Sequence, residues 1–143
     1  AHLAQEQGYG VGVVSSVPIS HATPAAAYAH NVHRDDFQDL TRDLLGLPSI
    51  AHPETPLAGM DVVIGGGHGE ERDKDKGGGK NFVPGNVYLT AADMRAVDVA
   101  HGGRYVVAQR TAGVEGRAGL AAAAKQAAER SQRLLGFYGV DRY

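Results

Sequence analysis

The segment from Ser20 to Arg34, which reads SHATPAAAYAHNVHR, holds many of the side chains in this sequence that could do chemistry. It follows the apolar run Val11–Ser16, a pattern that predicts a buried strand. The imidazole of His21 and the hydroxyl of Thr23 come where this strand is expected to end. Thr23 followed by Pro24 predicts a helix with Thr23 as its N-cap and Pro24 at its first position. A strand, a polar loop and a helix N-terminus together favour an anion site at the carboxyl end of the strand.

Arg34 can contribute to this site only if the helix is short. An unbroken helix from Thr23 would place Arg34 roughly 16 Å away, because each helical residue rises about 1.5 Å. We expect the helix to break near Asn31 and Val32, so that the chain doubles back. A surface ion pair between Arg34 and a following aspartate is the simpler interpretation of this arginine.

The residues His21–Arg34 resemble a motif of the alkaline phosphatase family: Asp or His, one residue, Thr or Ser, then Pro, an Ala-rich helix and a spaced Arg. The resemblance continues through Asp61–Gly67 (DVVIGGG) to Leu134–Gly139 (LLGFYG). The first motif is fairly specific, and the other two are weak alone. The sequence is similar to the central segment of a bacterial-type alkaline phosphatase and covers well under half of such an enzyme.

The resemblance implies a role for three of these residues. Thr23 would be a hydroxyl ligand of magnesium, and His21 would lie in the outer shell of that ion. Arg34 would bind two oxygens of the substrate phosphate, since its planar guanidinium matches phosphate geometry and stays charged at alkaline pH. One neutral hydroxyl cannot hold magnesium, which prefers about six oxygen ligands including carboxylates. Thr23 would therefore need ligands from outside this chain.

By the same resemblance, the whole enzyme would be a metal-dependent phosphomonoesterase that uses two zinc ions and one magnesium ion. It would hydrolyse phosphate monoesters to inorganic phosphate through a phosphoserine intermediate. Localisation would be periplasmic or extracellular, and the protein would be a homo-oligomer. The family's serine nucleophile and remaining metal ligands have no counterparts here, and no base is expected beside Ser15, Ser16 or Ser20. We expect residues 1–143 to be one internal fragment that needs the remaining parts of the enzyme and, alone, binds no metal and is inactive.

Composition excludes several other classes of protein. The chain has 143 residues, a formal net charge of −2 and no cysteine. A nucleic-acid surface, a disulfide framework and cysteine-ligated zinc are therefore not expected. Its apolar runs are shorter than the roughly 18 residues of a membrane span. We expect no signal peptide within these residues, which says nothing about export of the whole enzyme.

Alternating patterns predict an α/β fold. We expect about four strands in a mostly parallel sheet, with helices on both faces. The expected strands are Val11–Ser16, Asp61–Ile64 (closed by Gly65–Gly67), Tyr105–Ala108 and Leu134–Tyr138. The expected helices are Pro24–His30, Phe37–Leu45, Thr90 to about Ala100, and Gly119–Arg133. Residues 67–86 are expected to form a polar loop.

Other interpretations of these patterns stay open. A zinc site made only by His21, His30 and His33 is disfavoured because no third ligand is fixed beside the last two. The glycines at Gly65–Gly67 lack the Gly-Lys-Ser/Thr ending of a nucleotide-binding loop. His52, His68 and His101 are given no role. The alternative to a phosphatase segment is a stand-alone, non-catalytic α/β module that binds an anion or a nucleotide at its helix N-termini.

Overall fold

The computed structural model describes residues 1–74, 81–110 and 112–139. Its centre is a four-stranded sheet with the order β1-β2-β6-β5, in which neighbouring strands pair in parallel. The strands are β1 (Gly12–Pro18), β2 (Val62–His68), β5 (Tyr105–Ala108) and β6 (Arg133–Gly139). Each overlaps one of the four expected segments, although β1 and β2 begin one residue later than expected, so the prediction of a four-stranded, mostly parallel sheet is confirmed.

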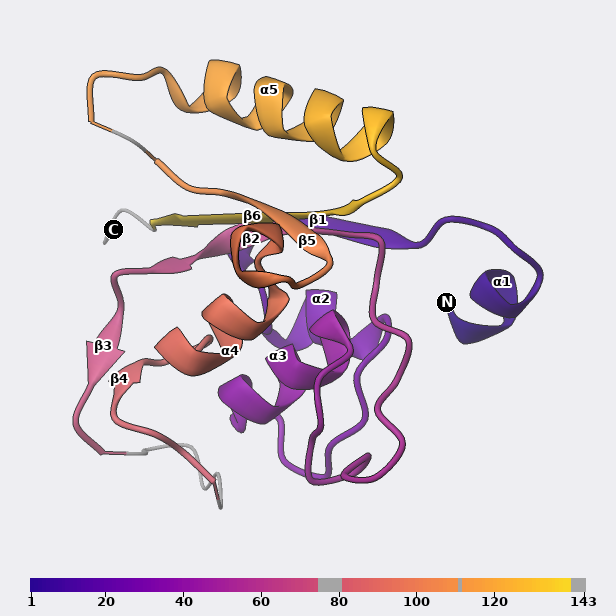
Figure 1. Ribbon diagram of the computed structural model, residues 1–143. Coiled ribbons are helices and arrows are strands. Elements are labelled where there is room, and N and C mark those ends of the chain that lie inside the picture. The colour runs from indigo at the N-terminus through magenta and orange to yellow at the C-terminus, as the bar shows by residue number, and fades with distance from the viewer. Residues whose placement is uncertain (75–80, 111, 140–143) are drawn as a thin grey trace.

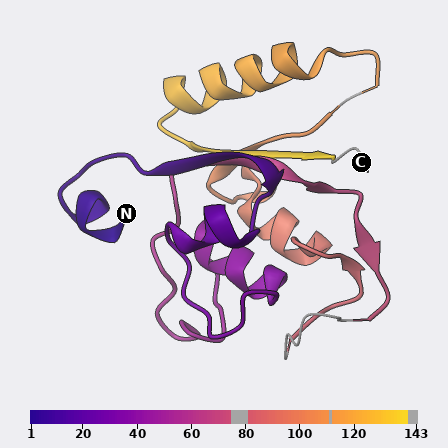
Figure 2. The ribbon, with the colours of Figure 1, turned by 180° about the vertical axis from the view of Figure 1, so that it is seen from behind.

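Helices cover both faces of this sheet (Figure 1), as the alternating pattern predicts. The long helix α5 (Gly116–Glu129) lies on one face, and the view from behind shows the same layers (Figure 2). The other face carries α2 (Ala22–Ala26), α3 (Phe37–Leu45) and α4 (Ala91–Val97), followed by the short helix η1 (Val99–His101). The larger core cluster, which includes Leu44 and Phe137, is separate from the smaller cluster of Val106 and Leu134 with the alanines of α5.

The glycines at Gly65–Gly67 lie inside β2, which corrects the expectation that they close this strand. Neighbouring groups approach the backbone too closely there for a side chain. A Cβ atom added to Gly65 would lie 2.9 Å from the carbonyl oxygen of Val17. A Cβ atom added to Gly67 would lie 2.5 Å from the ring of Tyr88. Glycine therefore lets the strand continue along a crowded path.

Element boundaries differ from expectation at several points. The last long helix, α5, begins at Gly116 and ends at Glu129, earlier at both ends than predicted. Its early end follows from Ser131, which adopts a φ of 51°, and from β6, which already begins at Arg133. A small antiparallel hairpin of β3 (Glu71–Arg72) and β4 (Gly85–Asn86) was not expected, because its strands are too short for an alternating pattern. Residues 75–80, at the centre of the expected polar loop, lie outside the described residues.

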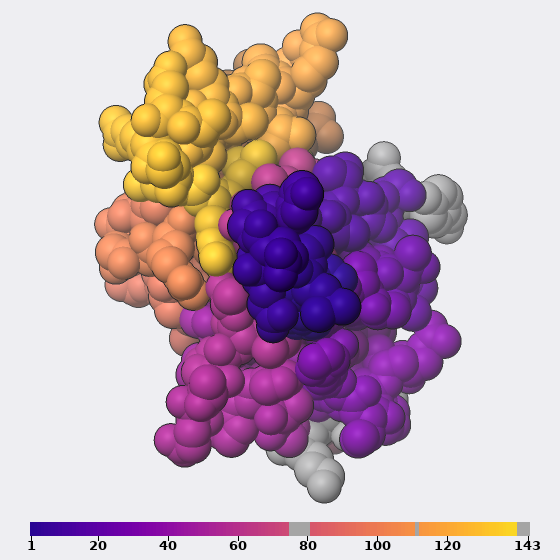
Figure 3. Space-filling model, turned by 90° about the vertical axis from the view of Figure 1, so that its right-hand side faces the viewer, coloured from indigo at the N-terminus to yellow at the C-terminus, as the bar shows by residue number. Residues whose placement is uncertain are grey.

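The N-terminal helix α1 (His2–Glu6) lies against the side of the molecule, as the space-filling view shows (Figure 3). Hydrogen bonds hold it there. The side chain of Gln5 donates to the carbonyl of Gly59 at 2.8 Å and accepts from the Tyr28 hydroxyl at 2.7 Å. A nitrogen of the His2 ring lies 2.8 Å from the Tyr28 carbonyl oxygen. Within the part of the chain that the structure describes, none of the helices has the length and apolar composition that crossing a bilayer requires.

The outer edge strand β1 leaves apolar surface uncovered. Val14 pairs in register with Ile64 and is 73% exposed, while α5 packs over β5 and β6. An uncovered parallel edge strand offers unpaired backbone groups and apolar side chains to another chain.

We therefore expect this chain to self-associate in solution through β1, because pairing would cover that edge. Sedimentation should show species larger than a monomer, and Val14→Lys should shift the distribution toward monomer by placing a charge on the edge. A monodisperse monomer with a high melting temperature would contradict this prediction.

Candidate functional site

The carboxyl end of β1 leads directly into a buried corner. The backbone N–H of Ile19 donates to the carbonyl of Gly66 at 3.1 Å, which holds the end of β1 against β2. Ile19 and Ser20 are both fully buried. Among the described residues, the hydroxyl of Ser20 has no hydrogen-bond partner. A buried hydroxyl without a partner is costly, so this corner is a place where a further polar group would be favourable.

Helix α2 begins at this corner, and its cap differs from the prediction. The N-cap is His21, with extended backbone angles of φ −61° and ψ 160°, so Thr23 is the second helical residue and not the cap. Pro24 occupies the third position, which it can do because the first N–H groups of a helix have no intrahelical acceptor. Pro24 and Ala25 are buried, whereas Thr23 is exposed. The Thr23 hydroxyl therefore makes no side-chain cap and remains open to solvent.

The chain turns after α2, and Arg34 lies on the loop that follows. The helix already ends at Ala26, earlier than the predicted His30. The side chain of Asn31 then organises the turn: its oxygen accepts from the backbone N–H of His33 at 2.8 Å, and its nitrogen donates to Asp39 at 2.9 Å. The expected helix break near Asn31 and Val32 is therefore wrong in position, and Asn31 instead organises the loop that follows the helix.

Arg34 lies on this turn with its side chain 67% exposed. Its guanidinium lies 3.6 Å from the carboxylate of Asp35, which is the surface ion pair of the simpler interpretation. Across the described residues, no hydrogen bond or ion pair joins Arg34 to His21 or Thr23. The structure therefore places the two predicted magnesium-site residues together in the first turn of α2, and Arg34 on the following loop.

Two buried carboxylates that accept hydrogen bonds from this loop were not predicted. Helix α3 buries polar residues as well as leucines, including Asp39 and Asp43. Asp39 is 1% exposed and accepts hydrogen bonds from the side chains of Asn31 and Asn81 and from the backbone N–H of Ile50, at 2.9, 3.2 and 2.9 Å. The pair of aspartates four residues apart on one helix was the only signal in the sequence. It indicates a shared face but not that the face is buried.

Asp43 forms a second buried group, with Ser49 and His52. The Ser49 hydroxyl donates to Asp43 Oδ1 at 2.6 Å, and His52 Nδ1 lies 3.0 Å from the same oxygen. These residue types occur in catalytic triads, but there the histidine lies between the other two and uses both ring nitrogens. Here His52 Nδ1 faces both partners and Ser49 is buried, so the arrangement is not that of an activated nucleophile.

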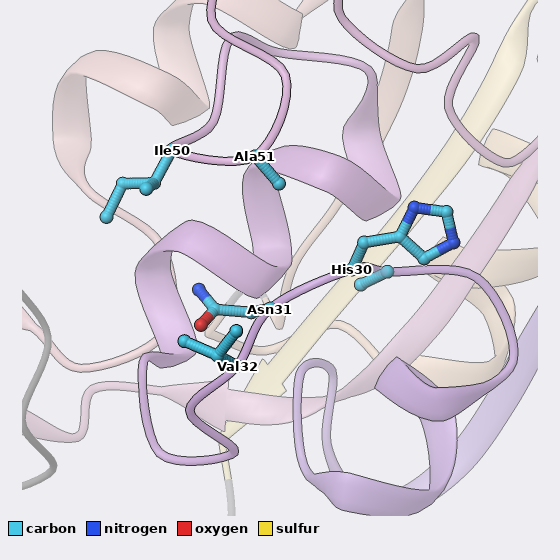
Figure 4. Close-up of a pocket in the computed structure, with 6 residues that line it drawn as sticks. His30, Asn31, Val32, Ile50 and Ala51 are labelled. Carbon is cyan, nitrogen blue, oxygen red and sulfur yellow. The ribbon is translucent and has the colours of Figure 1, made fainter.

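An open hollow of about 530 Å³ lies beside the turn that carries Asn31 (Figure 4). Its lining is mostly apolar and comes from the loop after α2 and the loop after α3. The lining residues are Ala29, His30, Asn31, Val32, Ile50 and Ala51.

Metal ligands are sparse in this region. Over residues 1–74, 81–110 and 112–139, no group of three or more His, Asp or Glu side chains is arranged to hold a metal ion. Thr23 supplies a neutral hydroxyl and His21 an imidazole, whereas magnesium requires several oxygen ligands with carboxylate charge. These two residues by themselves do not fit a magnesium ion.

Burial raises the pKa of three tyrosines of the larger core cluster. Desolvation is the main cause for Tyr28, whose hydroxyl donates to Gln5 of α1, and for Tyr105, whose hydroxyl donates to the Met60 carbonyl. Desolvation raises the pKa of Tyr88 to about 12, and the hydrogen bond that its hydroxyl donates to Glu70 adds to this shift. These tyrosines stay protonated at moderately alkaline pH.

The family model and the similar proteins all point to one family. The family model described as alkaline phosphatase matches residues 1–104. The tissue-nonspecific alkaline phosphatase isozyme of Gallus gallus is 38% identical over 69 residues, which are 45% of this chain and 13% of that protein. The same isozyme of Homo sapiens is 36% identical over 78 residues, 51% of this chain and 15% of that protein. An alkaline phosphatase of Gadus morhua is 38% identical over 69 residues, 45% of this chain and 14% of that protein.

No solved structure gives a significant match. This chain spans between 13% and 15% of the length of the three relatives. Those relatives are vertebrate proteins, so the expected bacterial type stays a prediction. The family model covers most of the sequence, including the whole segment from Ser20 to Arg34. The chain belongs to the alkaline phosphatase family.

Proposed function

We propose that this chain acts as part of a metal-dependent phosphomonoesterase that hydrolyses phosphate monoesters, with Arg34 binding the substrate phosphate. The observation that carries the proposal is the alkaline phosphatase match over residues 1–104, which contains the polar corner after β1 and the turn that carries Arg34. The relatives are far longer than this chain, so the remaining catalytic groups would come from outside it. We also propose that the whole enzyme is periplasmic or extracellular and a homo-oligomer.

The exposure of Arg34 supports its proposed role. The Arg34 guanidinium is 67% exposed and pairs with the adjacent Asp35 at 3.6 Å. It can exchange that partner at little cost, because exposed ion pairs contribute about 0–1 kcal/mol. A phosphate offers two oxygens to the planar fork and gives stronger, charge-assisted hydrogen bonds. The Asn31 turn, held by the buried Asp39, keeps the backbone before Arg34 in place.

Thr23 and His21 are proposed to contribute to the magnesium site only together with ligands from the rest of the enzyme. The alkaline phosphatase family is metal-dependent, and a bound metal would neutralise charge on the phosphate. Support comes from the exposed Thr23 side chain, which makes no cap hydrogen bond to α2, and from the buried hydroxyl of Ser20, three residues earlier, which lacks a partner among the described residues.

Phosphate binding by this chain tests the role of Arg34. We expect inorganic phosphate to bind with a dissociation constant of about 1 mM or weaker, because a lone arginine competes with water. A dissociation constant of 1 mM corresponds to a binding free energy of about −4 kcal/mol. Arg34→Ala should weaken binding roughly 10-fold, the loss of about one charge-assisted hydrogen bond. Titration followed by ³¹P NMR measures this directly.

The matched control is Arg117→Ala. Arg117 is also exposed, at 86%, and also pairs with a nearby acid, Glu115, at 3.3 Å. It lies on α5, on the other face of the sheet, so its loss should leave phosphate binding unchanged. Equal phosphate binding by the unaltered chain and Arg34→Ala would contradict the proposed role of Arg34.

A further inference from the structure

Three histidines from distant parts of the sequence lie in a row, and the middle one, His30, lines the hollow. The ring centroid of His30 is 5.1 Å from that of His2 and 5.3 Å from that of His52. His2 begins α1, His30 follows α2, and His52 lies between α3 and β2. In Figure 4 the imidazole of His30 extends from its loop away from Val32 and Ile50. These residues are distinct from those proposed above for phosphate and magnesium.

The nitrogens of His30 and His52 face each other. His30 Nδ1 and His52 Nε2 are 3.5 Å apart. Two imidazole nitrogens bound to one tetrahedral zinc ion, each at about 2.0–2.1 Å, are about 3.3 Å from each other. The two rings therefore already have nearly the nitrogen separation that a shared metal ion requires. Without a metal the same distance is a long N–H···N contact, which is weak by ordinary hydrogen-bond geometry.

Asp43 orients His52 for this role. The Asp43 side chain is fully buried and its Oδ1 lies 3.0 Å from His52 Nδ1. The Nδ1–H group of a neutral His52 would donate to this carboxylate, which leaves the lone pair on Nε2, the nitrogen that faces His30. A carboxylate behind a ligating histidine is the usual arrangement around protein-bound zinc, where it fixes the tautomer and the ring.

Other contacts hold Asp43 itself. Its Oδ2 accepts from the backbone N–H of His30 at 2.7 Å, and its Oδ1 accepts from the Ser49 hydroxyl at 2.6 Å. One buried carboxylate thus fixes the backbone of one histidine and the ring of the other. Because His30 is exposed and the His52 side chain is 22% exposed, an ion can approach from solvent.

We propose that His30 Nδ1 and His52 Nε2 bind one divalent transition-metal ion of the type that prefers imidazole, such as Zn²⁺, with water completing its coordination. His2 packs on the His30 ring, and its Nε2 is occupied by the Tyr28 carbonyl. The proposal does not depend on the proposed function. It departs from the expectation that this chain alone binds no metal. The proposed site has two protein ligands, whereas groups of three or more potential ligands are absent from the described residues.

The test uses the 143-residue chain, with Zn²⁺ alone as the probe, in isothermal titration calorimetry. We expect one Zn²⁺ site, with affinity reduced at least 10-fold in His52→Gln and in His30→Gln. Asp43→Asn should reduce the affinity about 10- to 100-fold, the usual effect of removing an outer-shell partner. The matched control is His33→Gln, an exposed histidine on the same loop, which should bind Zn²⁺ as the unaltered chain does.

Imidazole ¹⁵N NMR keeps the test decisive if a variant, Asp43→Asn above all, fails to fold. Zn²⁺ should shift the nitrogen resonances of His30 and His52 in the unaltered chain and leave those of His33 and His101 unchanged. The proposal is wrong if Zn²⁺ does not bind, if His52→Gln binds it equally well, or if the resonances that move belong to other histidines.

Discussion

Asp39→Ala is expected to lower the free energy of unfolding by about 3–5 kcal/mol, the usual cost of breaking a buried network of charges and hydrogen bonds. Asp39 is 1% exposed and accepts from Asn31, Ile50 and Asn81. It also lies 3.8 Å from the guanidinium of Arg42. Alanine would remove the acceptor that Ile50 and Asn81 use here, leave Asn31 with Asp36 as acceptor, and remove one charge partner of Arg42.

Urea unfolding followed by circular dichroism measures this loss. Asp39→Asn should lose less, because an amide oxygen can still accept from Asn31 or Ile50. The matched control is Asp35→Ala, an aspartate whose side chain is 44% exposed and whose ion pair is at the surface. It should change stability by less than about 1 kcal/mol. A loss below about 1 kcal/mol for Asp39→Ala would show that the buried network does not hold the Arg34 loop.

The strands and long helices could be predicted because local patterns determine them. The run YVVA of β5 and the helix Phe37–Leu45 have the predicted bounds. Their apolar spacing and the glycine after the helix are local signals, and Gly46 does adopt the left-handed conformation that ends a helix. The parallel sheet followed from the alternation of strands with helices.

Other features depend on tertiary contacts that local patterns do not encode. Gly65–Gly67 looked like the end of a strand, but β1 and Tyr88 approach the backbone there and only glycine fits. Thr23 looked like an N-cap, yet the extended backbone of His21 takes that position. His52 had no predicted role, because its neighbours His30 and Asp43 come from segments 22 and 9 residues away.

The same limit applies to the site. The sequence could predict the polar corner after β1 and an exposed Arg34, because both follow from one continuous segment. It could not predict the buried acceptors that fix this segment, since Asp39 and Asp43 look like surface residues of an amphipathic helix. The roles of His21, Thr23 and Arg34 in catalysis remain predictions.

Hydrolysis of a chromogenic phenol phosphate tests the central claim, that this chain supplies part of an alkaline phosphatase active site. The chain alone, with zinc and magnesium at about pH 9, should show no turnover, because an anion-binding arginine without an activated nucleophile does not hydrolyse esters. Unfolding should not interfere at that pH. A tyrosine whose pKa is higher in the folded than in the unfolded chain leaves the stability unchanged below its unfolded pKa of about 10. The stability falls only as the pH rises from there toward the folded pKa. The pKa of Tyr88 in the fold is about 12.

The decisive experiment places residues 1–104 into the human tissue-nonspecific isozyme, in place of the segment of that enzyme that corresponds to the same part of the alkaline phosphatase family model. We expect this chimera to hydrolyse the ester, Arg34→Ala to lower kcat/KM about 10- to 100-fold, and Asp35→Ala to leave it nearly unchanged. Equal kcat/KM for the chimera and its Arg34→Ala variant would contradict the account. So would turnover by the chain alone that survives repurification and is lost in Arg34→Ala.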